Sequence, residues 1–219
     1  MNTKLMVDFL VRLSKHNNRE WFIDHKNEVD VVKAEFKYLV QSIILKIADF
    51  DDDISFLEVE KCVFRLNRDL RFTKDKTPYK NHLGAAISPT GKKGHVFYYL
   101  QIDANQDRTI LAGGVWMPDK EVLNNIRKYI SNHFVELEDI IYDENFANVF
   151  GDLANEKLIK VPKGFEENHP AANFLRYKSF VVEKLISKKI LLSDNLEDYI
   201  VDYCKAMLPF ILFLRKAVK

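Results

Sequence analysis

Residues 82–116 read HLGAAISPTGKKGHVFYYLQIDANQDRTILAGGVW and hold three short runs in which apolar side chains alternate with others. An alternation with a period of two is typical of β-strands that have one buried face. The connections between the runs, at residues 88–94 and 103–107, are short and polar. Because parallel strands need crossover connections of a dozen or more residues, these short connections predict an antiparallel meander.

The alternation gives the predicted sheet two unequal faces. The first is apolar and is expected to pack against helices; its members are Leu83, Ala85, Ile87, Val96, Tyr98, Leu100, Ile102 and Ile110. The second is polar but aromatic; its members are His82, Gly84, Ser88, His95, Phe97, Tyr99 and Gln101, with Arg65 and Asn67 as further candidates. If the first turn pairs Ser88 with His95, His82 lies opposite Gln101. A face of this second kind suits ligand binding, and it suits an ordinary solvent-exposed surface equally well.

Helical periodicity dominates the rest of the chain. A short helix is expected over residues 5–13, and Asn17 with Glu20 has the form of a capping box that begins a long helix with buried positions between residues 29 and 47. Residues 51–53, three aspartates, are expected to form a solvated turn, and residues 58–66 and 179–185 to form strands. Further helices are expected after Pro118 and over residues 196–214. The prediction is one α+β domain over residues 1–219, with a mainly antiparallel sheet of four to six strands and the long N-terminal helix and further helices packed on one face.

Composition narrows the class of protein. The chain has 219 residues, 47% of them apolar and 30% charged, and a formal net charge of +1, so binding to polyanions must come from a local patch. The two cysteines, Cys62 and Cys204, are far apart and predict free thiols in a reducing compartment. No secretion signal is recognisable, and the longest apolar run, residues 207–214, is far short of the ~20 residues that span a bilayer. We therefore expect a cytoplasmic protein with no membrane partner.

Residues 65–80, called the basic segment below, read RLNRDLRFTKDKTPYK and contain six Lys or Arg and two Asp. The cations Arg65, Arg68, Arg71, Lys74, Lys76 and Lys80 are candidates for holding a phosphorylated ligand or a nucleic-acid backbone, and Phe72 and Tyr79 for stacking on a base. The alternative is an internal ion-pair lattice, in which Asp69, Asp75 and Glu20 neutralise the cations while Phe72 and Tyr79 fill the core.

Several strings in this chain resemble a known family. They are Asn17–Phe22 (NNREWF), Asp69–Lys80 (DLRFTKDKTPYK), Gly113–Pro118 (GGVWMP), Pro162–Phe165 (PKGF) and His169-Pro170. In this order and at these separations they resemble domain-of-unknown-function family 2461, over nearly the whole chain. The resemblance implies a single-domain fold and a cytosolic setting, and it carries no assigned activity or catalytic residues.

Other candidate residues are weaker. Gly113-Gly114 allows close approach of a ligand or of another backbone, and it is no phosphate loop because GxxxxGK[ST] and GxGxxG are both absent. The six histidines show no metal-ligand spacing, so no metal site is predicted, and no cofactor is indicated. His169 could pair with a nearby carboxylate, although a loop-capping role is the simpler interpretation.

The leading hypothesis is a binding module for a phosphorylated or otherwise anionic ligand at the basic segment, with Arg19 and Gly113-Gly114 nearby. The partner would be a phosphate-bearing small molecule or a nucleic acid. The first alternative is a hydrolase or phosphotransferase that uses Asp69 or Asp75 with His169. The second is a structural or partner-binding protein in which the basic segment only holds the fold.

Overall fold

A computed structural model describes residues 1–154 and 156–219 and contains a four-stranded antiparallel sheet in the order β1-β2-β3-β4. The strands are β1 (His82–Ile87), β2 (Phe97–Asp103), β3 (Ile110–Val115) and β4 (Phe180–Leu185). The first three form the predicted meander, and β4 adds to β3 after the chain has passed through several helices. The α+β class is confirmed, and the strand number is at the low end of the predicted range.

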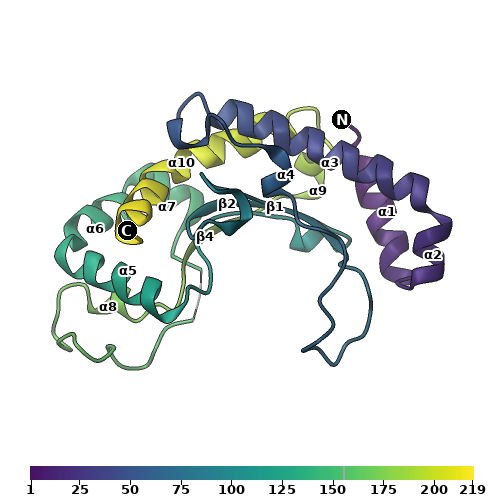
Figure 1. Cartoon of the computed structure of the whole chain (residues 1–219). Coiled ribbons are helices and arrows are strands. Elements are labelled where there is room, and N and C mark those ends of the chain that lie inside the picture. Colours follow the sequence, from purple (N-terminus) through teal and green to yellow (C-terminus); the bar gives the residue numbers. More distant parts are fainter. Residues whose placement is uncertain (155) are drawn as a thin grey trace.

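Helices cover one face of this sheet (Figure 1). Two long helices lie across that face, α3 (Lys26–Ile47) and α10 (Leu196–Ala217). One end of the sheet carries α1 (Thr3–Lys15) and α2 (Arg19–Asp24), and the other end carries α5 (Lys120–Asn132), α6 (Phe134–Ile141), α7 (Glu144–Phe150) and α8 (Ala172–Leu175). Two shorter helices are α4 (Val59–Cys62) and α9 (Lys188–Leu191). The predicted arrangement of helices on one face is therefore confirmed.

The core lies between the sheet and the two long helices. Phe36 of α3, Tyr98 of β2 and Met207 of α10 are all fully buried there, as the helical and strand periodicities of these segments require. Burial of one such side chain stabilises the fold by about 1.5–3 kcal/mol. Among the described residues no helix is both long and apolar enough to cross a membrane.

A buried ion pair fastens the end of α10 to the sheet. The Arg215 guanidinium donates to both carboxylate oxygens of Asp51, over 2.7 and 2.8 Å, and the Tyr98 hydroxyl donates to the same carboxylate over 3.0 Å. Asp51 is therefore buried. The prediction of a solvated turn was wrong at this position, because a cation 164 residues away in the sequence reaches it.

The predicted strand over residues 58–66 is absent. Residues 59–62 form α4, and the following chain makes only isolated bridges, Val63 to Ala85 and Asn67 to Tyr79. The alternation is still present, since Cys62 and Leu66 are buried and Phe64 is half-buried. The segment bends away from the sheet too soon to form a continuous ladder, so alternation alone was misleading.

Three further predictions needed correction. The 3₁₀ turn η2 (Gly91–Lys93) shifts the β1–β2 pairing by two residues, so that His82 lies opposite Asp103 rather than Gln101. Ile110 pairs with Gln101 and lies on the second face of the sheet rather than on the helix-covered face. Asn18, and not Asn17, caps α2 by accepting the Trp21 amide.

Candidate functional site

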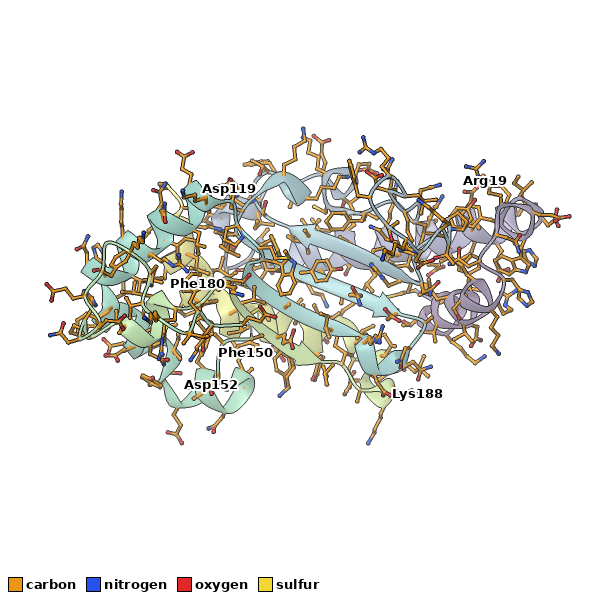
Figure 2. The ribbon with its side chains drawn as sticks, turned by 90° about the horizontal axis from the view of Figure 1, so that it is seen from below. Arg19, Asp119, Phe150, Asp152, Phe180 and Lys188 are labelled. Atoms are coloured by element: carbon orange, nitrogen blue, oxygen red, sulfur yellow. The ribbon has the colours of Figure 1, made fainter. Side chains whose placement is uncertain are left out.

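The second face of the sheet faces away from α3 and α10, and among the described residues no helix lies over it (Figure 2). We call it the open face. It contains a hollow of about 460 Å³. The lining residues are Phe64, Ala86, Lys92, Phe97, Tyr99, Gln101, Ile110, Ala112, Trp116, Val181 and Glu183. Two loops, the basic segment and residues 156–170, extend on this side of the sheet from its two ends (Figure 1).

Small residues beneath large aromatic ones shape the hollow. Ala86 and Ala112 form part of its floor, and a Cβ added to Gly84 would lie 3.0 Å from the Tyr99 hydroxyl. The Tyr99 ring lies edge-on to Phe64 and Phe97, with centroids 6.4 and 6.3 Å away. These three half-buried rings form an aromatic platform.

Trp116 stands beyond the end of β3 and is 55% exposed. The next residue, Met117, has a left-handed backbone with φ of 44°, which is uncommon for a residue that carries a Cβ. Its amide donates to the buried Ser179 hydroxyl over 2.9 Å. This hydrogen bond holds the turn that places Trp116 at the rim of the hollow.

A row of polar side chains runs along β2 on the open face. The Tyr99 hydroxyl donates to the Gln101 side-chain oxygen over 2.9 Å, and the Gln101 amide donates to Asp103 over 3.2 Å. The same Asp103 oxygen lies 3.9 Å from Nδ1 of His82. Burial, with a smaller contribution from Asp103, raises the pKa of Tyr99 to about 12, so this hydroxyl is a hydrogen-bond donor at neutral pH. The sequence interpretation placed Asp103 in a turn. Continuing the period of two from Tyr99 through Gln101 would have placed Asp103 on the open face.

The base of the basic segment is anchored in the core. Tyr79 is 7% exposed and stacks on Phe22 of α2, with ring centroids 3.8 Å apart and planes 9° apart. The Asn17 side chain donates to the Tyr79 carbonyl over 2.9 Å and accepts from the Tyr79 amide over 3.0 Å. Tyr79 is therefore a packing residue here and presents no free ring face for a base. Phe72, at the tip, is 93% exposed.

Part of the segment's charge is neutralised within the segment. Arg68 donates to Asp75 over 2.5 Å, and Arg71 donates to Asp69 over 2.6 Å. The Thr77 backbone amide, followed by the Arg68 guanidinium, lowers the pKa of Asp75 to about 2.

The lattice hypothesis is thus met only in part. Lys76 donates to the Leu70 carbonyl over 3.0 Å rather than to a carboxylate. Within the described part of the chain, neither Glu20 nor Lys74 forms an ion pair, and Arg19 at the start of α2 forms none either.

Lys80 differs from these loop cations. It is half-buried, and its ammonium lies 5.1 Å from the centre of the Phe64 ring. Its charged neighbours include Arg65, which is positive, and His82, which is positive when it is protonated. Burial, followed by the Arg65 guanidinium, lowers the pKa of Lys80. In residues 1–154 and 156–219 no carboxylate lies within ion-pairing distance of Lys80 or Arg65.

A second hollow of about 560 Å³ lies beside Lys80. Its lining residues are Val11, Ser14, Arg68, Asp75, Thr77, Tyr79, Lys80, Asn81, His82, Asp103, Ala104, Asn105 and Arg108. We call it the polar hollow. Arg108 is exposed there, and no ion pair to it is found within the described residues.

The glycine pair lies away from the basic segment. A Cβ on Gly113 would lie 2.5 Å from the Met207 sulfur of α10, and a Cβ on Gly114 would lie 2.0 Å from the Phe180 carbonyl oxygen. Gly114 also has a φ of 126°, which disfavours any side chain. Close packing, one of the two readings of this pair, accounts for both glycines.

His169 also lies far from the basic segment. Its Nε2 is 2.8 Å from the Ser131 hydroxyl, and its Nδ1 accepts from the Ala171 amide over 3.0 Å. Its loop lies at the opposite end of the sheet from the loop that carries Asp69 and Asp75 (Figure 1). The structure therefore does not assemble the hydrolase pairing of either aspartate with His169. Among the described residues no group of three or more metal-ligating side chains is gathered.

Comparison with known proteins places the chain in a family. A search of curated proteins and a search of solved structures gave no match. Residues 5–213 match the model of a conserved hypothetical protein family, DUF2461, which is the family that the sequence motifs resemble. Because this match covers nearly the whole chain, the protein belongs to the DUF2461 family.

Proposed function

We propose that this protein is a binding module for a phosphorylated or otherwise anionic ligand, and that Lys80 is the centre of the anion site. The observation that carries the proposal is the half-buried Lys80 ammonium, which has Arg65 for a charged neighbour and no carboxylate partner among the described residues. A partly buried charge is costly unless an opposite charge compensates it. A bound phosphate would supply that charge.

The polar hollow gives the anion room and further donors. Arg108 and the amides of Asn81 and Asn105 line it together with Lys80. Arginine offers paired N–H donors to a phosphate, and amide side chains can complete its hydrogen bonds. The acids on the same wall, Asp75 and Asp103, already accept hydrogen bonds from Arg68 and Gln101. Of the cations that line the hollow, Arg68 is thus paired, while Lys80 and Arg108 have no ion pair among the described residues.

A small phosphorylated molecule fits this site better than a long nucleic acid does. The net charge of the chain is +1, and the exposed Arg71 at the tip of the basic segment is occupied by Asp69. Long polyanions are usually held by an extended positive surface. We also propose a cytoplasmic setting, which the two free and buried cysteines support.

The test is thermal unfolding with inorganic pyrophosphate, on the wild type, Lys80→Gln and the control Lys74→Gln. Both substitutions remove one lysine charge from the basic segment, but Lys74 is exposed near its tip. At about 100 times the dissociation constant, a ligand stabilises the folded state by about 2.7 kcal/mol. We expect this shift in the wild type and in Lys74→Gln, weakened by added salt, and none in Lys80→Gln. Equal shifts in all three proteins, or none in the wild type, would refute the assignment.

A further inference from the structure

We propose that the open face binds the flat ring of a nucleotide while Lys80 binds its phosphate, so that the ligand is a free nucleoside phosphate. This inference rests on the proposed function and adds the chemical class of the ligand. It rests on the contact between Lys80 and Phe64, which brings the polar hollow next to the hollow of the open face. Phe64 lines the hollow of the open face, and Lys80, above its ring, lines the polar hollow.

The aromatic platform supplies the surface for the ring. Every nucleobase has a π-face, and stacking on protein aromatic rings is the common way to hold one. Phe97 and Tyr99 of β2 and Phe64 beside the sheet are half-buried, so packing holds each ring while part of it stays accessible. Trp116 at the rim adds a fourth ring that is more than half exposed.

The edges of the open face are polar, as recognition of a heterocycle requires. Glu183 of β4 lies opposite Ala112 in the register and is exposed, and no ion pair to it is found in the described residues. Its carboxylate can accept from an exocyclic amino group of a base. The opposite rim is closed by Lys92, whose ammonium donates to the Glu60 and Val63 carbonyls over 3.2 and 3.1 Å.

Size and charge favour a free nucleotide over the other possible occupants. The hollow of about 460 Å³ falls within the range of roughly 300–1,000 Å³ that is typical of small-molecule pockets. Cations stand at one border of the platform, at Lys80 and Arg65, which matches a molecule with one ring and one phosphate group. An apolar partner surface would leave these charges without a counterpart.

The test is a fluorescence and calorimetric titration with three probes: ADP, inorganic pyrophosphate and adenosine. Trp116 is one of only two tryptophans, so a base that stacks on the open face should quench part of the emission, and this quenching should be lost in Trp116→Phe. The variants are Tyr99→Leu, which removes a platform ring, Tyr99→Phe, which keeps it, and the control Phe72→Leu at the exposed tip.

We expect ADP to bind more tightly than pyrophosphate. Tyr99→Leu should weaken the binding of ADP by about 5- to 150-fold, the usual effect of losing one stacked ring, and leave the binding of pyrophosphate unchanged. Tyr99→Phe and Phe72→Leu should bind ADP nearly as the wild type does. Unchanged pyrophosphate binding shows that Tyr99→Leu is still folded, and Tyr99→Phe shows whether the ring or the hydroxyl is needed.

The outcomes separate this inference from the proposed function. If pyrophosphate binds through Lys80 but ADP binds no better, or if Tyr99→Leu weakens neither probe, the ring site is refuted and the anion site stands. Suppose that adenosine binds, that Tyr99→Leu weakens its binding, and that Lys80→Gln changes the binding of neither ADP nor pyrophosphate. The proposed anion site is then refuted, and only a ring-binding site remains. Two other results would also overturn the assignment to a free nucleotide. One is a wild-type dimer that Tyr99→Leu converts to monomer, and the other is a short single-stranded nucleic acid that binds far more tightly than ADP.

Discussion

The ammonium of Lys80 lies 5.1 Å from the centre of the Phe64 ring and joins the basic segment to the open face of the sheet. A lysine above an aromatic ring gains about 0.5–1 kcal/mol at an exposed site, which is far from the full compensation of a buried charge. Most of the segment's other charges find partners within the segment, as Arg68 and Asp75 do. Lys80 is therefore a half-buried cation that no carboxylate of the described residues pairs, whereas Arg65 and Lys74, which also have no ion pair there, are exposed.

The first prediction concerns stability without ligand. Replacing Lys80 by Met keeps the long apolar stem and removes a charge that burial and Arg65 both disfavour. We expect Lys80→Met to unfold at equal or higher urea concentration than the wild type, a pattern typical of residues kept for function rather than stability. The matched variant Lys74→Met should be neutral. Marked destabilisation of Lys80→Met alone would show that the ammonium has a structural partner.

The second prediction concerns His82, whose pKa is lowered by burial and then by the Lys80 ammonium, while Asp103 acts in the opposite direction. The folded state therefore binds fewer protons at His82 than the unfolded state does, and this residue lowers the stability of the fold as the pH falls below about 6.5. Lys80→Met, or bound pyrophosphate beside Lys80, should raise the pKa of His82. The ring-proton chemical shift followed against pH measures it.

Lys74→Met serves as the control for this titration, because it removes a charge at the exposed tip of the segment. We expect its His82 midpoint to equal that of the wild type. A midpoint that moves equally in both variants would mean that His82 senses the net charge of the protein rather than the neighbouring ammonium.

The third prediction concerns the glycine pair. At Gly114 an added methyl group would meet the Phe180 backbone carbonyl, and the left-handed φ alone costs a residue with a side chain about 1–3 kcal/mol. At Gly113 it would meet the end of the flexible Met207 side chain, which can move. Gly114→Ala should therefore lower the free energy of unfolding more than Gly113→Ala does, in urea denaturation. The reverse order would contradict the close approach of β3 and β4.

The fourth prediction concerns the buried pair of Asp51 and Arg215. Arg215→Met leaves a buried carboxylate with only the Tyr98 hydroxyl, and breaking such pairs typically costs about 3–5 kcal/mol. Lys46→Met breaks the surface pairs of this partly exposed lysine with Asp198 and Glu197, and it should cost about 1 kcal/mol or less. Urea denaturation measures both. Equal small losses would mean that the pair contributes little to holding α10 on the sheet.

Local patterns predicted the sheet and the long helices because each depends on neighbours in the sequence. The alternation in β2 and the buried stripe of α3 both match their burial. The pairing of β1 with β2 was missed by two residues because the 3₁₀ turn at Gly91–Lys93 changes the length of the connection. A turn of this kind leaves no trace in the alternation of the flanking strands.

The sequence predicted which kinds of residue make up the candidate site, but not how they lie relative to one another. The cations of the basic segment and the aromatic second face were both visible in the sequence, but the sequence did not say that Lys80 joins them. Tyr79 was a candidate both for stacking on a base and for filling the core. It is a core residue because Asn17 and Phe22, far earlier in the sequence, hold it. Long-range contacts of this kind decide which side chains of a motif remain available.

The most direct test of the central claim is a map of backbone amide shifts during a titration of ¹⁵N-labelled protein with ADP. The account predicts saturable shifts that cluster at Phe64, Lys80 and Tyr99 and spread to their neighbours on β1 and β3. Lys80→Gln should abolish them at the same ADP concentrations. Shifts confined to the exposed tip of the basic segment, shifts around α6, α7 and α10, or no shifts at all would contradict it.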